Sequence, residues 1–285
     1  MKKFVWITVG FFLLVSFKQD KQAYQLFDIK GKKTQYKDLL KEARKADIIF
    51  FGELHNNPIC HWLQRELTRD LAKLESRKLI LGAEMFETDN QLLLDEYISG
   101  TISERSFETQ ARLWPNYETD YKPLVEIARK NGLPFIATNI PRRYASVVHK
   151  KGFEGLDSLS AEAKSLIPPL PVEYDPELKG YQEMLNMMGG HASPNLPKAQ
   201  AIKDAAMAYQ ILQHMDEHSL FLHFNGTYHS NNFEGIAWYV KRDQPGLQML
   251  TIASVEQKDI DELDDENQSL ADFILCVPET MTKTH

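Results

Sequence analysis

The feature that most constrains this chain is an alternation, from residue 47 onward, between short apolar runs and longer amphipathic segments. This is the pattern of parallel strands joined by crossover helices. It predicts strands at 47–51, 78–86, 134–140, 219–225 and 247–255, with 271–277 as an edge strand. Helical spacing of apolar residues predicts helices at 61–75, 89–98, 103–112, 120–131 and 197–217. The expected fold is therefore α/β, with a mostly parallel sheet flanked by helices.

Proline and glycine interrupt this alternation between about residues 155 and 196, where the stretch YQEMLNMMGGHASP is rich in methionine. An insertion of this length between two α/β units is typical of a helical cap. A surface excursion with its own small core is the alternative. The chain is thus expected to form one domain over residues 23–285, with a cap insertion at about 155–196.

The first residues, MKKFVWITVGFFLLVSF, combine two lysines with an apolar run shorter than the ~20 residues of a membrane-spanning helix. This pattern predicts a leader over residues 1–22 and export to the periplasm or cell envelope. No small-x-small cleavage site is visible, so an uncleaved anchor that associates with the membrane is the alternative. Cys60 and Cys276 are expected to be two unpaired buried thiols, with one disulfide as the alternative.

The net charge of −7 argues against nucleic acid as a partner, because binding to a phosphate backbone needs concentrated Lys and Arg. The expected partner is a small molecule. A homodimer is a further expectation that the sequence leaves open.

Polar side chains follow four of the predicted strands, at the edge where parallel sheets bind ligands. The two GxxH patterns, GELH at 52–55 and GTYH at 226–229, occupy equivalent places after strands. Because Glu53 and His55 are two residues apart, both should project to one face of extended backbone. The sequence therefore predicts a shared crevice whose candidate residues are Glu53, His55, Glu84, Asn139, Arg142, Arg143, His223 and His229.

Several of these residues also have a simpler structural interpretation. Glu53 or Glu84 can cap the helix that follows its strand. His223 lies inside an apolar run and can be a hydrogen-bonded core histidine. His61 is expected in the first turn of the helix at 61–75, where it either joins the site or faces solvent. Trp114 and Tyr117 are either loop packing or walls of a pocket.

Five blocks together resemble the ChaN-like family of haem-binding, iron-regulated bacterial proteins. They are GELHNNPICHWLQRELTRDL, LGAEMFE, NIPRR, KDAAMAYQI and HFNGTYHS, and the resemblance runs from about residue 45 to 277. The wider superfamily includes TIKI metalloproteases, TraB-type proteins and erythromycin esterases. Family members are often lipoproteins, and this chain lacks a cysteine directly after its leader.

The resemblance implies a ChaN-like or EreA-like α/β fold with a helical cap, an exported location and a role in haem binding or iron uptake. Carried over by motif, the polar pocket of the superfamily maps onto Glu53, His55, Glu84, His223 and His229. Asn139, Arg143 and Asp204 are implied as neighbours of that pocket.

Two functions follow from these residues. Haem iron takes axial ligands such as His, Tyr or Met, and the cap offers Tyr174, Tyr181, Met187, Met188 and His191. Arg142 or Arg143 would then reach the propionates.

The alternative is a metal-dependent hydrolase in which Glu53, His55, Glu84 and His229 hold a divalent ion that activates water. Without a metal, His55 backed by Glu53 would deprotonate water directly.

Overall fold

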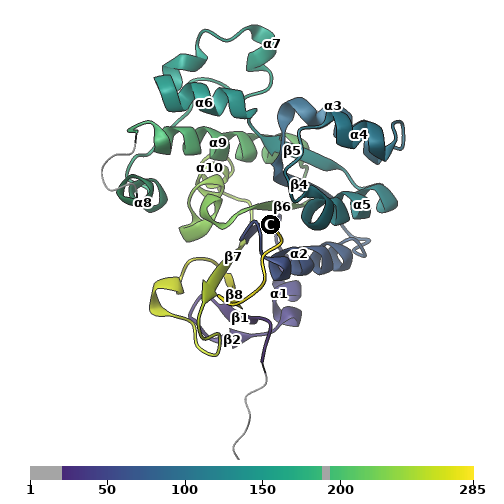
Figure 1. The fold of residues 1–285 in the computed structure, drawn as a ribbon, viewed down its shortest axis with the longest axis vertical. Coiled ribbons are helices and arrows are strands. Elements are labelled where there is room, and N and C mark those ends of the chain that lie inside the picture. The colour runs from purple at the N-terminus through teal and green to yellow at the C-terminus, as the bar shows by residue number, and fades with distance from the viewer. Residues whose placement is uncertain (1–20, 188–192) are drawn as a thin grey trace, which may run out of the picture.

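Eight strands form one sheet in the order β2-β1-β8-β7-β3-β6-β4-β5 (Figure 1). The structure is a computed structural model that describes residues 21–187 and 193–285. The strands are β1 (Gln25–Asp28), β2 (Lys33–Thr34), β3 (Ile48–Glu53), β4 (Lys78–Glu87), β5 (Phe135–Asn139), β6 (Ser219–Gly226), β7 (Met249–Gln257) and β8 (Phe273–Pro278). All pairings among β3 to β8 are parallel, which confirms the predicted sheet.

The α-helices are α1 (Tyr36–Ala43), α2 (Pro58–Leu71), α3 (Gln91–Ile98), α4 (Glu104–Gln110), α5 (Lys122–Asn131), α6 (Arg142–Lys151), α7 (Ala161–Lys164), α8 (Lys179–Met187), α9 (Leu196–His214) and α10 (Ile236–Asp243). Short helical turns are η1 (Thr88–Asn90), η2 (Tyr117–Tyr121), η3 (Phe153–Leu156), η4 (Thr227–His229), η5 (Asn231–Phe233) and η6 (Asp265–Asn267).

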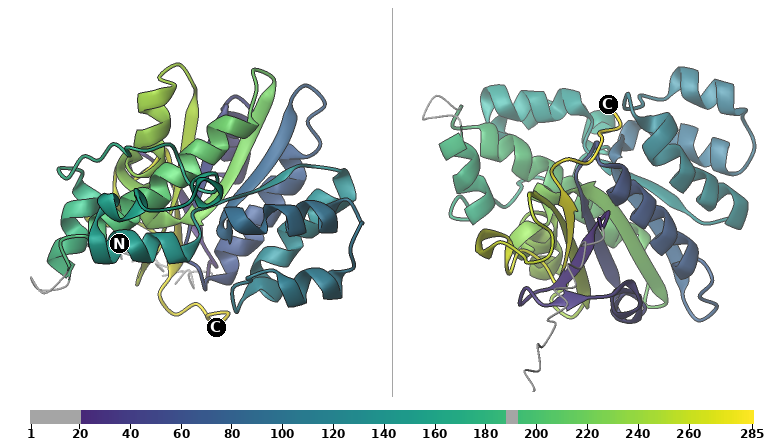
Figure 2. Two further views of the ribbon diagram at one scale, coloured as in Figure 1. Left: turned by 90° about the horizontal axis from the view of Figure 1, so that it is seen from above. Right: turned by 60° about the horizontal axis from the view of Figure 1, so that its bottom comes forward.

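The central strand β3 is buried on both faces of the sheet. Ile49 and Phe51 pack in the core formed with α1 to α5, whereas Ile48 and Phe50 pack in the core formed with α9 and α10. Successive side chains of a strand point to opposite faces, so a continuous apolar run is what a strand covered on both sides requires. Figure 2 shows the two helical layers on either side of the sheet.

The prediction that 271–277 forms an edge strand is wrong. The corresponding strand β8 pairs with β7 on one side and antiparallel with β1 on the other. The hairpin of β1 and β2 was not predicted, because its strands are only four and two residues long. Its turn is closed by the Asp28 carboxylate, which accepts hydrogen bonds from the backbone of Lys30 and Lys32.

Helix α2 begins three residues earlier than predicted. Asn57 caps it by accepting a hydrogen bond from the backbone N–H of Ile59, and Pro58 occupies the first helical position. His61 therefore lies inside the helix, and its side chain is buried rather than facing solvent.

The segment between α6 and α9 carries η3, α7 and α8 where the cap was predicted. The predicted leader falls mostly on residues 1–20, which lie outside the described residues. Among the helices of the described ranges, none is long and apolar enough to cross a membrane. Cys60 and Cys276 are both buried and unpaired, as expected.

Candidate functional site

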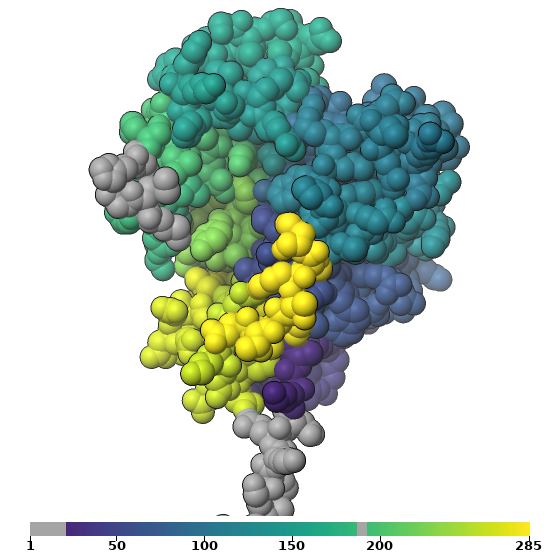
Figure 3. Space-filling view, viewed as in Figure 1, coloured from purple at the N-terminus to yellow at the C-terminus, as the bar shows by residue number. Residues whose placement is uncertain are grey.

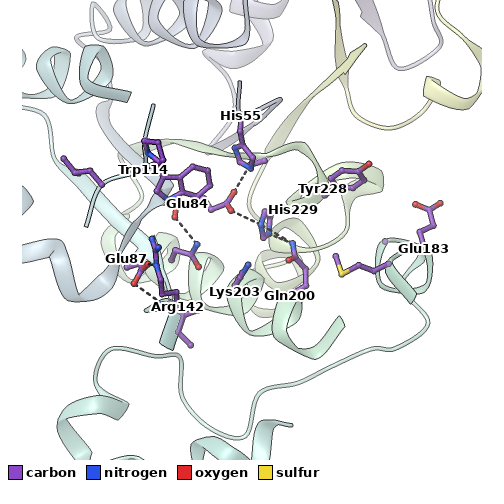
Figure 4. A pocket seen from close by; sticks show the side chains of 17 residues that line it. His55, Glu84, Glu87, Trp114, Arg142, Glu183, Gln200, Lys203, Tyr228 and His229 are labelled. Carbon is purple, nitrogen blue, oxygen red and sulfur yellow. Dashed lines mark hydrogen bonds and ion pairs between the residues drawn. The ribbon is translucent and has the colours of Figure 1, made fainter. Parts of the chain in front are cut away.

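A cavity of about 610 Å³ lies at the carboxyl ends of β3, β4, β5 and β6 (Figure 4). This volume is typical of a small-molecule or cofactor site. The apolar part of its wall comes from Leu113, Trp114, Pro115, Ile140, Met184 and Tyr228. The polar residues at its inner end are His55, Glu84, Asn139 and His229, which we call the polar cluster.

Strand register explains why residues from separate segments meet there. Glu53 at the end of β3 pairs with Gly226 at the end of β6, so the two GxxH motifs emerge side by side. Asn139 ends β5 and donates a hydrogen bond from Nδ2 to the backbone carbonyl of Glu84 on β4 at 3.0 Å. The structure thus brings Glu53, His55, Glu84, Asn139 and His229 together, as the sequence predicted.

Glu53 orients His55 and does not line the cavity itself. Its Oε1 accepts hydrogen bonds from Nδ1 of His55 at 2.9 Å and from the Tyr121 hydroxyl at 2.7 Å. Its Oε2 accepts one from Nε2 of Gln64 at 2.5 Å. Because Nδ1 of His55 is the donor in this arrangement, Nε2 is left to face the cavity.

Nε2 of His55 lies close against the backbone of Gly226. A Cβ placed on Gly226 would lie 2.7 Å from Nε2 of His55. Burial disfavours the charged imidazolium, but the hydrogen bond to Glu53 and the charge of Glu84 outweigh it and raise the pKa of His55. The ring also packs edge-on against Trp114, with centroids 4.9 Å apart.

His229 is clamped between two carboxylates. Its Nδ1 lies 2.5 Å from Oδ1 of Asp204, and its Nε2 lies 3.2 Å from Oε1 of Glu84. Burial disfavours the charge, but Glu84 and Asp204 outweigh burial and raise the pKa of His229 to about 10. His229 is therefore a buried cation that has no free nitrogen for acid–base work.

The two carboxylates that flank His229 respond differently to burial. Burial raises the pKa of Asp204, and the charge of His229 offsets this only in part. Burial acts in the same direction on Glu84, but the charges of His229 and His55 outweigh it and lower the pKa of Glu84. The other oxygen of Glu84 accepts a hydrogen bond from the backbone N–H of Gly226 at 2.7 Å.

His61 supports the site from behind. Its Nδ1 faces Oε1 of Gln64 at 3.1 Å, and its Nε2 faces the backbone carbonyl of His55 at 3.1 Å. Both neighbours are acceptors, since the Gln64 amide nitrogen is directed at Glu53. His61 therefore links helix α2 to the backbone of the turn that carries His55.

His223 is a core residue and does not line the cavity. Its Nδ1 lies 3.0 Å from Oδ1 of Asn225, and its Nε2 lies 2.8 Å from the Thr138 hydroxyl. Burial lowers the pKa of His223 to about 4, so the ring is neutral. Of the two interpretations left open by the sequence, the structure supports the hydrogen-bonded core histidine.

The two arginines of the NIPRR turn take different places. Arg142 lines the cavity with a side chain that is 62% exposed, and it pairs with Glu87. Arg143 pairs with Asp89 and lies over the ring of Tyr144, away from the cavity lining. The prediction that Arg143 belongs to the polar pocket is therefore not supported by its position.

Of the predicted haem ligands of the cap, Tyr174 and Tyr181 do not line the cavity. Tyr181 is buried and donates a hydrogen bond to Oδ2 of Asp204 at 2.8 Å. Tyr174 stacks on Tyr181 with centroids 5.7 Å apart. Met187 is the last residue of α8. Met188 and His191 lie outside the described residues.

The cavity residues that sequence reasoning missed include Tyr228, Gln200 and Lys203. Tyr228 sits inside the GTYH motif and is 64% exposed. Gln200, Lys203 and Asp204 are spaced i, i+3 and i+4 on α9, so they share one helical face. That spacing, read outward from Asp204, was the signal that could have found the α9 residues.

A preformed metal site is not seen in the part of the chain that the structure describes. No group of three or more His, Cys, Asp or Glu side chains there is arranged to hold a metal ion. Metal binding by Glu53, His55, Glu84 and His229 stays a prediction.

Comparison with known proteins adds a family and a fold. Residues 39–240 match the family model described as haem-binding uptake, Tiki superfamily, ChaN. A curated relative, Protein RETICULATA-RELATED 5, chloroplastic, of Arabidopsis thaliana, is 31% identical over 146 residues, which is 49% of this chain and 19% of the relative. The chain thus spans about a fifth of the length of that relative.

Two solved structures share the fold. The structure of ChaN of Campylobacter jejuni with cofacial haem is 18% identical with a TM-score of 0.67, covering 88% of this chain and 96% of that one. A mutant of the erythromycin esterase EreC in its open conformation is 12% identical with a TM-score of 0.55, covering 93% of this chain and 99% of that one. The predicted α/β fold and the similarity suggested by the motifs are confirmed.

Proposed function

The chain belongs to the family of haem-binding uptake proteins of the Tiki superfamily that includes ChaN, and from this premise we propose that it binds haem in the cavity at the carboxyl ends of the strands. Haem is the cargo in this proposal. Its macrocycle needs an apolar slot, its iron needs an axial ligand, and its propionates need basic groups or water.

The observation that carries the proposal is the cavity itself. It has a volume of about 610 Å³ and combines an aromatic and aliphatic wall with a polar inner end. Trp114 and Tyr228 supply flat apolar surface, and Met184 from α8 supplies an adaptable one. The buried carboxylate of Glu84 repels the anionic propionates, so they pair with the basic residues of the lining.

Tyr228 is the side chain best placed to hold the iron. It lines the cavity, it is 64% exposed, and its hydroxyl makes no hydrogen bond within the described ranges. His229 and Tyr181 are committed to Asp204. Met184 and Nε2 of His55 are the other donors on the cavity wall.

Arg142 and Lys203 are the basic groups for the propionates. Both line the cavity, and Arg142 reaches it from the start of α6. Lys203 makes no ion pair within 4 Å in residues 21–187 and 193–285, so its ammonium group is available to an anionic ligand.

The test is a titration with haem followed by visible absorption. The wild-type protein should show a saturable band at one haem per cavity, and Tyr228→Phe should change the band and weaken binding at least tenfold. Leu92→Ala is the control, because Leu92 is equally exposed and lies outside the cavity lining. A saturable band that is the same in Tyr228→Phe would exclude Tyr228 as the ligand, and no saturable band at all would exclude the proposal.

A second candidate function is ester hydrolysis, and one observation favours it. The Glu53–His55 pair engages Nδ1 of His55, and Nε2 makes no hydrogen bond within the described residues although His55 lines the cavity. In this reaction His55 takes a proton from water, the water oxygen attacks the carbonyl carbon, and the proton passes to the leaving alcohol as the ester bond breaks. The shared fold with an erythromycin esterase is compatible with this chemistry but does not establish it.

The hydrolase is tested with p-nitrophenyl esters of short acids. If the protein is a hydrolase, His55→Ala should lower kcat/KM about a hundredfold or more, the ordinary contribution of a general base. His218→Ala, at an exposed histidine, should leave it unchanged. Turnover at the buffer rate, or equal turnover in His55→Ala, would rule this reaction out for these substrates.

The cellular location rests on the sequence pattern of the first residues. We propose export to the periplasm or cell envelope, where a haem-uptake protein would meet its cargo. Fractionation of cells that express the full chain tests this directly, and recovery with cytoplasmic markers would contradict it. A homodimer and membrane association likewise stay predictions.

A further inference from the structure

The turn that carries His55 is held by side chains from distant parts of the chain. Its backbone closes with a hydrogen bond from the N–H of Asn57 to the carbonyl of Leu54 at 2.9 Å. The carbonyl of His55 accepts hydrogen bonds from Nδ2 of Asn116 at 2.8 Å and from Nε2 of His61 at 3.1 Å. The direction of the His55 ring therefore depends on how firmly these polar contacts hold the turn.

Thr284, in the segment at residues 281–284, adds one hydrogen bond to the same turn and one to Asp120, which supports it. The backbone N–H of Thr284 donates to the carbonyl of Asn56 at 2.9 Å. The Thr284 hydroxyl donates to Oδ2 of Asp120 at 2.8 Å. The same oxygen of Asp120 accepts the Asn116 amide at 2.7 Å and lies 3.4 Å from Nε2 of His61.

The neighbouring residue Lys283 reaches the other side of the turn. Its ammonium group pairs with Oε1 of Glu256, which also accepts a hydrogen bond from Nδ2 of Asn57 at 3.3 Å. Asn57 is the cap of α2. Figure 3 shows this C-terminal segment, in yellow, lying across the face of the molecule against the blue residues of the β3–α2 region.

We propose that residues 281–284 form a positioning segment for His55, in which Thr284 and Lys283 fix the 54–57 turn so that the ring keeps Nδ1 on Glu53 and Nε2 beside Gly226. Thr284 is a positioning residue, since it acts through Asp120, Asn116 and the backbone of Asn56. None of the strand-end motifs contains these residues, and the segment lies more than 200 residues from His55 in sequence.

A position held this way has a measurable consequence. The His55 side chain is more than a third exposed, so packing alone does not fix it. Loss of one of the hydrogen bonds that hold the turn ordinarily changes an equilibrium about fivefold. Without the Thr284 hydroxyl, the 54–57 turn should open about fivefold more often, and His55 should lose its single orientation.

The experiment compares three variants of the full chain without any ligand. Thr284→Val keeps the shape of the side chain and removes the hydroxyl, whereas Thr284→Ser keeps the hydroxyl. Thr282→Val is the matched control, because Thr282 is exposed and its side chain makes no hydrogen bond within the described residues. Circular dichroism first confirms that each variant is folded.

The readouts are the ring ¹⁵N shifts of neutral His55 and the hydrogen exchange of the 54–57 amides. In the wild-type protein and in the Thr284→Ser and Thr282→Val variants, neutral His55 should carry its hydrogen on Nδ1. In Thr284→Val its shifts should move toward the average of the two tautomers, and the amides should exchange about fivefold faster. Unchanged shifts and exchange in a folded Thr284→Val protein would overturn the proposal. If Thr284→Val does not fold, Lys283→Met replaces it: shifted ring nitrogens and faster exchange would support the proposal, and unchanged values would overturn it.

The last step rests on the proposed function. If haem binds against His55, the dissociation constant of haem should also rise about fivefold in Thr284→Val and not in Thr282→Val. The nitrogen shifts are measured without haem. If the wild-type protein binds no haem, the proposed function is rejected, and the shifts alone still decide whether Thr284 positions His55.

Discussion

The place that a Cβ on Gly226 would occupy lies 2.7 Å from Nε2 of His55. The backbone of Gly226 has φ −58° and ψ 140°, which any residue adopts without strain. Glycine is therefore required here for space and not for conformation. The same position lies 3.5 Å from a carboxylate oxygen of Glu84, so the absence of a side chain at Gly226 lets the His55 ring and this buried carboxylate approach the backbone of β6 closely.

Gly226→Ala should push His55 out of place. We expect the free energy of unfolding to fall by about 1–3 kcal/mol, the usual effect of overpacking, and ligand binding in the cavity to be lost. Chemical denaturation and haem titration measure the two effects. Gly246→Ala is the control, because nothing lies within 4 Å of the Cβ that it would add. Equal stability and equal haem binding of the two variants would show that His55 does not need its close approach to Gly226.

Glu53→Gln should release His55. The change removes the charge and places an amide where His55, Tyr121 and Gln64 all donate hydrogen bonds. Since the contact with Glu53 contributes to the raised pKa of His55, that pKa should fall in the variant. The free energy of unfolding should drop by about 3–5 kcal/mol, because a buried charge network loses its anion. Histidine titration by NMR and chemical denaturation test both, and an unchanged His55 pKa would contradict the assignment.

The charge of His229 should make stability depend on pH. Its pKa is raised from 6.5 to about 10 in the folded protein by Glu84 and Asp204, against the effect of burial. A raised folded-state pKa gives a stabilisation that is fully present below the unfolded pKa and is lost as pH rises toward 10. Between pH 7 and 8.5, His229 should therefore lower the free energy of unfolding by up to about 1.4 kcal/mol for each unit that the pH rises.

His229→Gln should remove that part of the slope, while His218→Gln, at an exposed histidine, should keep it. The variant leaves Glu84 and Asp204 without their cation, so it should also be about 3–5 kcal/mol less stable at pH 7. If it does not fold, the wild-type protein still gives the answer by NMR. A His229 ring that titrates near pH 6.5 would show that it is not the buried cation described.

Arg142 and Arg143 form a natural pair for testing haem binding. Arg142 lines the cavity and Arg143 does not, although both are exposed and pair with a carboxylate. Arg142→Ala should weaken haem binding about 5- to 30-fold, equivalent to one or two charge-assisted hydrogen bonds, whereas Arg143→Ala should have little effect. The difference should shrink at high salt. A larger effect of Arg143→Ala would place the propionates elsewhere.

The predicted parallel strands and most of the long helices came directly from local pattern. Buried strands need continuous apolar runs, and surface helices need an apolar stripe, so residues such as Ile48 to Phe51 are informative without any partner. The short strands β1 and β2 lacked that information, and β8 was read as an edge because its partner β1 is four residues long.

The candidate site shows the same division. Glu53, His55, Glu84 and His229 were found because they follow strands in a parallel sheet, where all carboxyl ends meet. Their protonation and roles depended on neighbours that no spacing revealed. Gln64 holds Glu53, Asn116 holds the carbonyl of His55, and Asp204 holds both His229 and Tyr181.

By itself, the sequence determined that strands would carry glutamate and histidine to one end of a sheet, because apolar periodicity and motif position are local properties. Only the tertiary structure decided which histidine keeps an open nitrogen, that Tyr228 lines the cavity, and that Thr284 holds the turn of His55. The physical reason is that hydrogen-bond partners are neighbours in space, and the fold brings together groups that lie more than two hundred residues apart in sequence. Each donor or acceptor is then satisfied by the neighbour that the fold places beside it.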